Sequence, residues 1–215
     1  TNKIARQKNN ENLEKLQQQE ITYEASITGT LKQKFDRILH EYQAGHINED
    51  QFDDRMDNQF PTSVILKLKI RSQIMMIKND PAKRWVNGSI GHIVELEENV
   101  IWVIIEGKKY KVEREEWKDI EYLYSSSGDK LTEKVIGSFS QFPLKLAWAI
   151  TVHKSQGKTF DKIAFDIGNG AFAHGQTYVA ISRCKSLEGV TLLREVQPKD
   201  LIVDRRVIEY HKRIT

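Results

Sequence analysis

The side chains best suited to chemistry lie in one polar cluster, residues 151–159, with the sequence TVHKSQGKT. Its hydroxyl, imidazole, ammonium and amide groups would suit the phosphate oxygens of a nucleic-acid backbone or of a nucleotide. The cluster ends in Gly-Lys-Thr, the closing tripeptide of a phosphate-binding P-loop. A P-loop also needs a glycine five residues before the glycine of that tripeptide, because the loop must bend around the phosphates. Val152 stands there, and no other segment completes the signature, so the sequence carries no P-loop.

A second polar cluster, residues 175–183 with the sequence GQTYVAISR, ends in a serine and an arginine that follow an apolar helical run. The helix would give the Arg183 side chain a rigid base. A rigidly held arginine can neutralise the charge that develops on a phosphoryl group during its transfer. Taken by itself, however, Arg183 is better interpreted as an exposed arginine in a salt bridge, since such arginines are common.

The secondary-structure elements that must position these clusters are predicted to be of different types along the chain, and the first segment is mainly helical. Residues 2–19 predict a polar helix with a sparse apolar stripe, and residues 21–27 alternate as a strand does. Two further helices are predicted within residues 31–60, where Gly45 would end the first and Asn48 would cap the second. This charged helical hairpin is expected to be an exposed insertion without chemistry.

Between residues 64 and 142 the pattern is one of short β segments separated by turn signals such as Asn-Gly and Glu-Gly. The expected strands cover residues 64–70, 74–77, 90–96, 100–105, 110–112 and 135–139. Short strands in this number favour a small β-barrel of the SH3 or OB kind. This region contains Trp85, Trp102 and Trp117. We interpret them as core residues in preference to surfaces on which bases stack, because barrel aromatics usually fill the core.

After Pro143 strands and helices alternate, which favours a parallel sheet with both faces covered. The strands are predicted at residues 144–151, 162–167 and 190–195, and the helices at residues 175–185 and 204–213. Functional loops of such sheets lie beyond the carboxyl ends of the strands. The cluster at residues 151–159 follows the first predicted strand, so we expect it at such an end.

The bulk composition permits a nucleic-acid partner without demanding one, because the 215 residues carry a formal charge of only +3. A hydrophobic content of 39% is ordinary for a globular protein, and no apolar run approaches the length of a membrane span. The single cysteine, Cys184, excludes an internal disulfide and fits a cytoplasmic protein. The histidines lack the paired spacing of metal ligands, so no metal site is expected.

Taken together, the two clusters resemble a known family. Three stretches are similar, in this order, to the region of motifs V and VI in 5′→3′ superfamily-one DNA helicases of the Pif type, relatives of RecD. They are LAWAITVHKSQGKT at residues 146–159, GQTYVAISR at residues 175–183 and SLEGV at residues 186–190. IMMIKN at residues 74–79 and VNGSIG at residues 86–91 resemble the start of the family's SH3-like insertion. The first residues resemble its motif IV region. The resemblance covers nearly the whole chain except the helical hairpin.

The resemblance implies an α/β fold: a RecA-like second motor domain with a parallel sheet, interrupted by an SH3-like β-barrel and by the helical hairpin at about residues 31–60. The motor domain would comprise residues 1–65 and 143–215, and the barrel residues 66–142. In the family, ATP lies between two RecA-like domains, and the P-loop and the Mg²⁺ ligand belong to the first. This chain would therefore be the C-terminal part of an ATP-dependent DNA helicase. Alone it would be inactive and would bind neither ATP nor Mg²⁺.

The same resemblance implies roles for individual residues. Arg183 would be the arginine finger that reaches the γ-phosphate, and Gly157 would bring the backbone close to the nucleotide. The residues that would contact single-stranded DNA are Thr151, His153, Lys154 and Ser155. The other partner would be the N-terminal RecA-like domain of the same protein, with no membrane involved. Arg6, near motif IV, is a further candidate for the nucleotide. The alternative is a non-enzymatic nucleic-acid-binding module that keeps the helicase fold.

Overall fold

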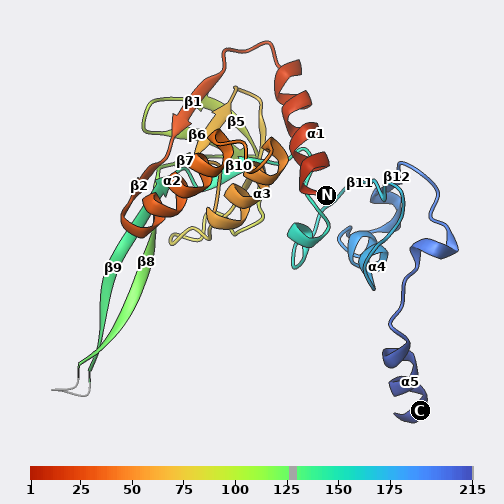
Figure 1. The fold of residues 1–215 in the computed structure, drawn as a ribbon. Helices are drawn as coiled ribbons and strands as arrows, with labels where there is room; N and C mark the ends of the chain where they lie inside the picture. Colours follow the sequence, from red (N-terminus) through yellow and green to blue (C-terminus); the bar gives the residue numbers. More distant parts are fainter. Residues whose placement is uncertain (126–129, 215) are drawn as a thin grey trace. The chain divides into compact units, whose positions relative to one another are not determined.

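The computed structural model describes residues 1–125 and 130–214. The chain forms two compact units, Thr1–Ala149 and Ile150–Thr215, which are described separately (Figure 1). Residues 126–129, which the sequence placed inside the predicted barrel, lie outside the described residues. Within the described part, no helix is long and apolar enough to cross a membrane.

The helices of the first unit are α1 (Asn2–Lys15), α2 (Gly29–Gln43) and α3 (Glu49–Gln59), and two short strands lie between α1 and α2. Helix α1 ends earlier than predicted, because the glutamines at residues 17–19 bring no apolar side chain to bury. The other two helices are confirmed. Gly45 has a φ of +73°, which favours glycine, in the turn after α2. The Asn48 side chain accepts a hydrogen bond from the Gln51 amide at 2.9 Å, and the Gln51 side chain accepts from the Asn48 amide at 3.0 Å.

The helical hairpin is largely exposed, as the sequence suggested, since no residue of α3 is buried, but it also packs against the rest of the first unit. Its buried residues include Ile38 and Phe60. The Phe60 ring stacks on Phe139 of the neighbouring sheet, with ring centroids 5.2 Å apart. On its other side, α3 is tied to α1 by ion pairs to Arg6. The charge of α3 concealed this packing, because its acidic residues pair with α1 and do not all face water.

A five-stranded antiparallel sheet with the order β10-β4-β5-β6-β7 forms the centre of the first unit. Its strands are β4 (Gln73–Met76), β5 (Ile90–Leu96), β6 (Ile101–Ile105), β7 (Lys108–Val112) and β10 (Leu144–Leu146). β5 has the predicted bounds. Between β6 and β7, Glu106 and Gly107 both have positive φ, as a tight two-residue hairpin requires. Among the described residues β10 and β7 are sheet edges, so the sheet does not close into a barrel.

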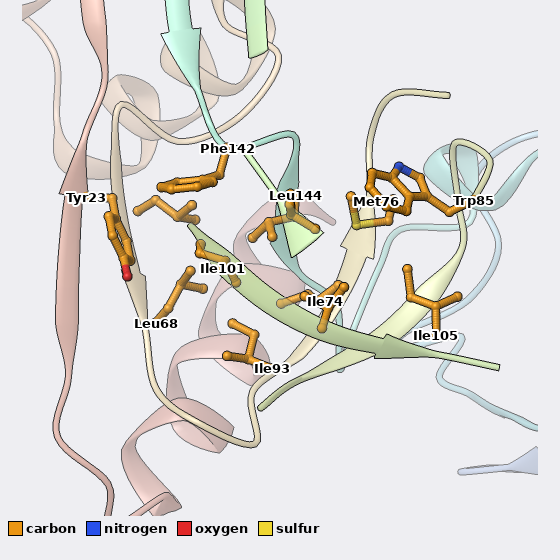
Figure 2. Close-up of a cluster of buried hydrophobic side chains, with 13 residues drawn as sticks. Tyr23, Leu68, Ile74, Met76, Trp85, Ile93, Ile101, Ile105, Phe142 and Leu144 are labelled. Atoms are coloured by element: carbon orange, nitrogen blue, oxygen red, sulfur yellow. The ribbon is translucent and has the colours of Figure 1, made fainter. Parts of the chain in front are cut away.

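The core of this unit collects side chains from several strands (Figure 2). Leu68, Ile74 and Ile101 are fully buried there, and the ring of Tyr23 meets that of Phe142 edge to face at 5.0 Å. The alternation of buried and exposed residues along each strand supplies these side chains, since successive residues point to opposite faces. Trp85 is also in this core, which confirms the first of the three tryptophan assignments.

Two smaller sheets flank the core. β1 (Ile21–Glu24) pairs with β3 (Ile65–Leu68), and β2 (Ser26–Thr28), β9 (Lys130–Gln141) and β8 (Glu115–Ser125) form a sheet of order β2-β9-β8. The single strand predicted at residues 21–27 is therefore two strands with different partners. β8 was not predicted at all. β8 and β9 form a long ribbon (Figure 1), and Tyr122 and Tyr124 are exposed on it, so its sequence lacks the alternation of a half-buried strand.

The second unit is smaller and more irregular. It contains β11 (Ile163–Phe165), β12 (Val190–Leu192), α4 (Gln176–Ile181), α5 (Arg205–Ile214) and short 3₁₀ helices at His153–Ser155, Leu187–Gly189 and Pro198–Asp200. β11 and β12 are parallel, and in the described residues they are the whole parallel sheet apart from one isolated bridge. The strand predicted at residues 144–151 is wrong: only its first residues form β10, which pairs antiparallel with β4. The first polar cluster therefore does not follow a parallel strand.

Candidate functional site

The first polar cluster folds as a tight turn around the 3₁₀ helix His153–Ser155. The Ser155 amide donates to the carbonyls of Thr151 and Val152, each at 3.1 Å, and the Ser155 hydroxyl donates to the Val152 carbonyl at 2.6 Å. The Thr151 hydroxyl accepts from the Lys154 amide at 3.4 Å. Ser155 is buried, whereas His153 and Lys154 are exposed. Two of the four predicted DNA contacts thus hold the turn together, and two lie on its surface.

Gly157 follows directly and supplies the left-handed residue of the turn, with a φ of +72°. No atom lies within 4 Å of the position that a Cβ would occupy there, so the backbone at Gly157 is open to a ligand. Lys158 is partly buried, and this burial lowers the pKa of its ammonium group from the usual value.

Arg183 lies two residues beyond the end of α4 and its side chain folds back on that helix. Its Nε donates to the Val179 carbonyl at 2.9 Å, and one terminal nitrogen donates to the Ser182 hydroxyl at 2.9 Å. A cation is favoured at this end of a helix, where carbonyl groups lack partners. No carboxylate pairs with Arg183 in the described part of the chain, so the salt bridge considered from the sequence is not found.

Backbone hydrogen bonds join the ends of the two polar clusters. The Phe160 amide donates to the Arg183 carbonyl at 2.8 Å, and the Lys185 amide donates to the Phe160 carbonyl at 3.0 Å. Phe160 and Cys184 form a parallel bridge between them. We call this contact the Phe160–Cys184 junction. Gly189 packs against it so closely that a Cβ there would lie 2.2 Å from the Asp161 carbonyl oxygen. The structure thus brings together two clusters that are separate in the sequence.

Asp200 is a buried charge that sequence reasoning missed. Its carboxylate accepts two hydrogen bonds from the Arg194 guanidinium, at 2.8 and 3.0 Å, and one from the Gln197 amide at 2.9 Å. These donors hold the pKa of the Asp200 carboxyl far below its usual range. The Asp200 carbonyl also accepts from the Thr177 hydroxyl at 2.6 Å, which fixes the first turn of α4. No motif marks this pair, because its partners meet only through the folding of a loop.

Arg6, in the first unit, forms ion pairs with Asp53, Asp54 and Asp57 of α3 at 3.0 to 3.2 Å. These partners attach α1 to the helical hairpin, and no sequence pattern indicated them. In the described part of the chain, no three His, Cys, Asp or Glu side chains gather in a way that could hold a metal ion.

Comparison with known proteins gives relatives over most of the chain, although no protein-family model matches it. The chain is 35% identical over 153 residues to the ATP-dependent DNA helicase Pif1 of Bdellovibrio bacteriovorus, which is 71% of this chain and 32% of that protein. It is 34% identical over 178 residues to the human ATP-dependent DNA helicase PIF1, which is 80% of this chain and 26% of that protein.

Solved structures agree with these relatives. Pif1 from Bacteroides sp in complex with ADP-AlF4 superposes with a TM-score of 0.76 at 31% identity, covering 99% of this chain and 43% of that one. Bacteroides Pif1 bound to ssDNA gives a TM-score of 0.71 at 31% identity, again covering 99% of this chain and 43% of that one. The chain therefore matches these Pif1 structures along nearly its whole length but spans less than half of each.

Proposed function

This chain is a relative of the Pif1 DNA helicases, and we propose that it supplies the second RecA-like motor domain of an ATP-dependent DNA helicase. In this role it would help to couple ATP hydrolysis to movement along single-stranded DNA and to duplex unwinding. The observation that carries the proposal is the Phe160–Cys184 junction. It connects a turn suited to phosphates with an arginine suited to a phosphoryl group, so a change at one cluster would be transmitted to the other.

The proposal keeps the domain division implied by the family. Residues 1–65 and 143–215 would be the two parts of the motor domain, and residues 66–142 an SH3-like insertion. Hydrogen bonds cross the first border, since β2 pairs with β9. The insertion and the start of the motor domain would therefore fold together.

On the nucleotide side, Arg183 would act on a nucleotide held by the N-terminal RecA-like domain of the same protein. ATP and Mg²⁺ would supply the reacting phosphoryl group and the metal charge there. The residues of this chain fit one side of ATP only, because Gly157 offers open backbone and Arg183 a cation, without a P-loop. They do not fit Mg²⁺, since the described residues contain no acidic cluster for a metal. To reach a phosphate, the Arg183 guanidinium would leave the Val179 carbonyl and present its planar fork.

On the DNA side, His153 and Lys154 would contact phosphates of the single strand. Thr151 and Ser155 would hold the turn that presents them, because their hydroxyls are used within it. Contacts of this kind are indifferent to sequence and position the strand without reading bases. They suit a motor that moves along any sequence.

The test uses the intact protein that contains this chain. Arg183→Ala should lower DNA-stimulated ATP hydrolysis by a factor on the order of a thousand, the effect of losing an arginine finger. Affinity for single-stranded DNA without nucleotide should change little, and Arg205→Ala, an exposed arginine of α5, should leave both unchanged. Turnover that survives Arg183→Ala would contradict the assigned role. DNA binding by an intact protein without any ATPase activity would favour the non-enzymatic module.

A further inference from the structure

We propose that a hollow beside Trp117 is a second place where single-stranded nucleic acid binds, with one base stacked on the indole. The hollow has a volume of 240 Å³ and lies in the first unit between α2, the end of α3 and the start of β8. Its lining includes Leu31, Lys34, Phe60, Trp117, Lys118 and Asp119. The proposal rests on the proposed function only for the identity of the partner, since a helicase meets single strands.

The indole of Trp117 has a rigid support. It contacts the ring of Phe139 with centroids 5.8 Å apart, and Phe139 in turn stacks on Phe60. Both phenylalanines are buried, so the Trp117 ring rests on close-packed side chains. Trp117 itself is half-buried and lines the hollow. Lys78 Nζ lies over the Trp117 ring, 5.3 Å from its centroid, and Lys78 does not line the hollow. The part of the indole that lines the hollow would be the stacking platform for a base, because every base has a π-face.

Two ammonium groups flank the hollow and are only loosely held. Lys34 lies 3.5 Å from the Asp119 carboxylate and Lys118 lies 3.5 Å from Glu116. Charge-assisted hydrogen bonds are normally about 2.7–2.9 Å long, and exposed ion pairs contribute little. The Asp119 carboxylate is engaged more closely by the Thr30 hydroxyl, at 2.7 Å. Phosphates can therefore compete for both lysines.

Size and charge together favour a nucleic acid over a peptide. Pockets for drug-sized ligands are about 300–1,000 Å³, so a hollow of 240 Å³ admits a single planar base and little more. An apolar or proline-rich peptide would fill the same space but would bring no anionic group to Lys34 and Lys118 beyond their long pairs with Asp119 and Glu116. A base stacked on Trp117 places its own phosphates at the rim, where these lysines lie.

The first experiment measures binding of a fluorescently labelled oligothymidylate to this chain by anisotropy at low salt. Trp117→Ala should weaken binding by about 5- to 150-fold, the range for losing one stacked base. Trp117→Phe keeps a ring and should weaken it much less, which separates stacking from unfolding. The matched control is Trp102→Ala, because the Trp102 ring lies under Lys109 at 4.6 Å, as the Trp117 ring lies under Lys78, but does not line the hollow. Equal binding by Trp117→Ala and the unaltered chain overturns the proposal.

The second experiment measures the salt dependence of the same binding. Replacing Lys34 and Lys118 together by alanine should reduce the log–log slope by about 0.7 for each phosphate that is no longer neutralised. Replacing Lys109 and Lys111 on β7 makes the same change in net charge and should leave the slope closer to that of the unaltered chain. If the two pairs reduce the slope equally, the effect is one of net charge and the hollow is not a site.

Lys154→Ala, in the second unit, separates this proposal from the proposed function. If Lys154→Ala weakens binding and Trp117→Ala does not, the hollow is overturned and the function stands. If Trp117→Ala weakens binding and Lys154→Ala does not, the hollow stands and the assignment of the first polar cluster fails.

A proline-rich peptide serves as the last probe. If it perturbs the Trp117 indole NMR signal and oligothymidylate does not, the hollow is a peptide site and the proposal is wrong.

Discussion

Gly189→Ala should loosen the Phe160–Cys184 junction. A Cβ at this position would lie 2.2 Å from the Asp161 carbonyl oxygen and 2.6 Å from the Cys184 sulfur, where 3.4 Å is an ordinary contact. The backbone around Asp161 must therefore move by about 1 Å, because a carbonyl cannot turn aside as a side chain does. Overpacking of this kind costs about 1–3 kcal/mol. We expect the loss to fall on the junction itself.

Hydrogen exchange measured by NMR reports this loss directly. The amides of Phe160 and Lys185 donate the two hydrogen bonds of the junction, so their exchange follows its local opening. A cost of about 1–3 kcal/mol corresponds to exchange that is about 5- to 150-fold faster. The amide of Ile93, which donates to Ser72 in the first unit, should keep its rate and serves as the internal control.

A second substitution tests the geometry. Cys184→Ala added to Gly189→Ala removes the contact with sulfur but leaves the contact with the Asp161 carbonyl. The double variant should therefore recover only part of the lost protection. Unchanged exchange in Gly189→Ala would refute the close approach, and full recovery in the double variant would show that the sulfur alone caused the strain. If the intact protein is the proposed helicase, Gly189→Ala should also slow its DNA-stimulated ATP hydrolysis, because the junction holds the Arg183 backbone.

Three further predictions concern a buried charge, a helix cap and a proposed DNA contact. Arg194 lowers the pKa of Asp200 in the folded state below its unfolded value, so the pair stabilises the fold fully above about pH 4 and less as the pH falls further. Circular dichroism between pH 5 and 2 should show this loss of stability, and Asp200→Asn should already be destabilised at pH 7. Asn48→Ala should cost about 1 kcal/mol in urea unfolding followed by tryptophan fluorescence, which reports on the first unit because all four tryptophans lie there. Lys154→Ala should lower the salt slope of single-stranded DNA binding by about 0.7, and an unchanged slope would remove Lys154 from the DNA contacts.

Elements with local determinants were predictable from the sequence. The bounds of β5 and the cap at Asn48 agree with the structure, because alternation and capping depend on residues a few positions apart. The order of the two polar clusters was also sufficient to indicate the helicase relatives. In each case the signal lies within a short stretch of chain, where the sequence alone is informative.

Pairing between distant segments was not predictable in the same way. Residues 144–146 have the apolar pattern of a buried strand, but nothing local shows that they pair antiparallel with β4. β8 escaped prediction because much of its surface is exposed, and so its sequence carries no alternating pattern. The strand order, which leaves the sheet open, likewise depends on pairing between strands that are far apart in the sequence.

The sequence by itself determined which residues could do chemistry: an arginine at the end of an apolar helix and a polar turn without a P-loop. Only the tertiary structure decided how these residues are held. The hydrogen bonds between Phe160 and residues 183–185, the burial of Asp200 against Arg194, and the hollow beside Trp117 each join segments at least six residues apart. Such contacts form only when the whole chain folds, because burial and hydrogen bonding then stabilise many distant segments together. No short stretch of sequence therefore predicts them.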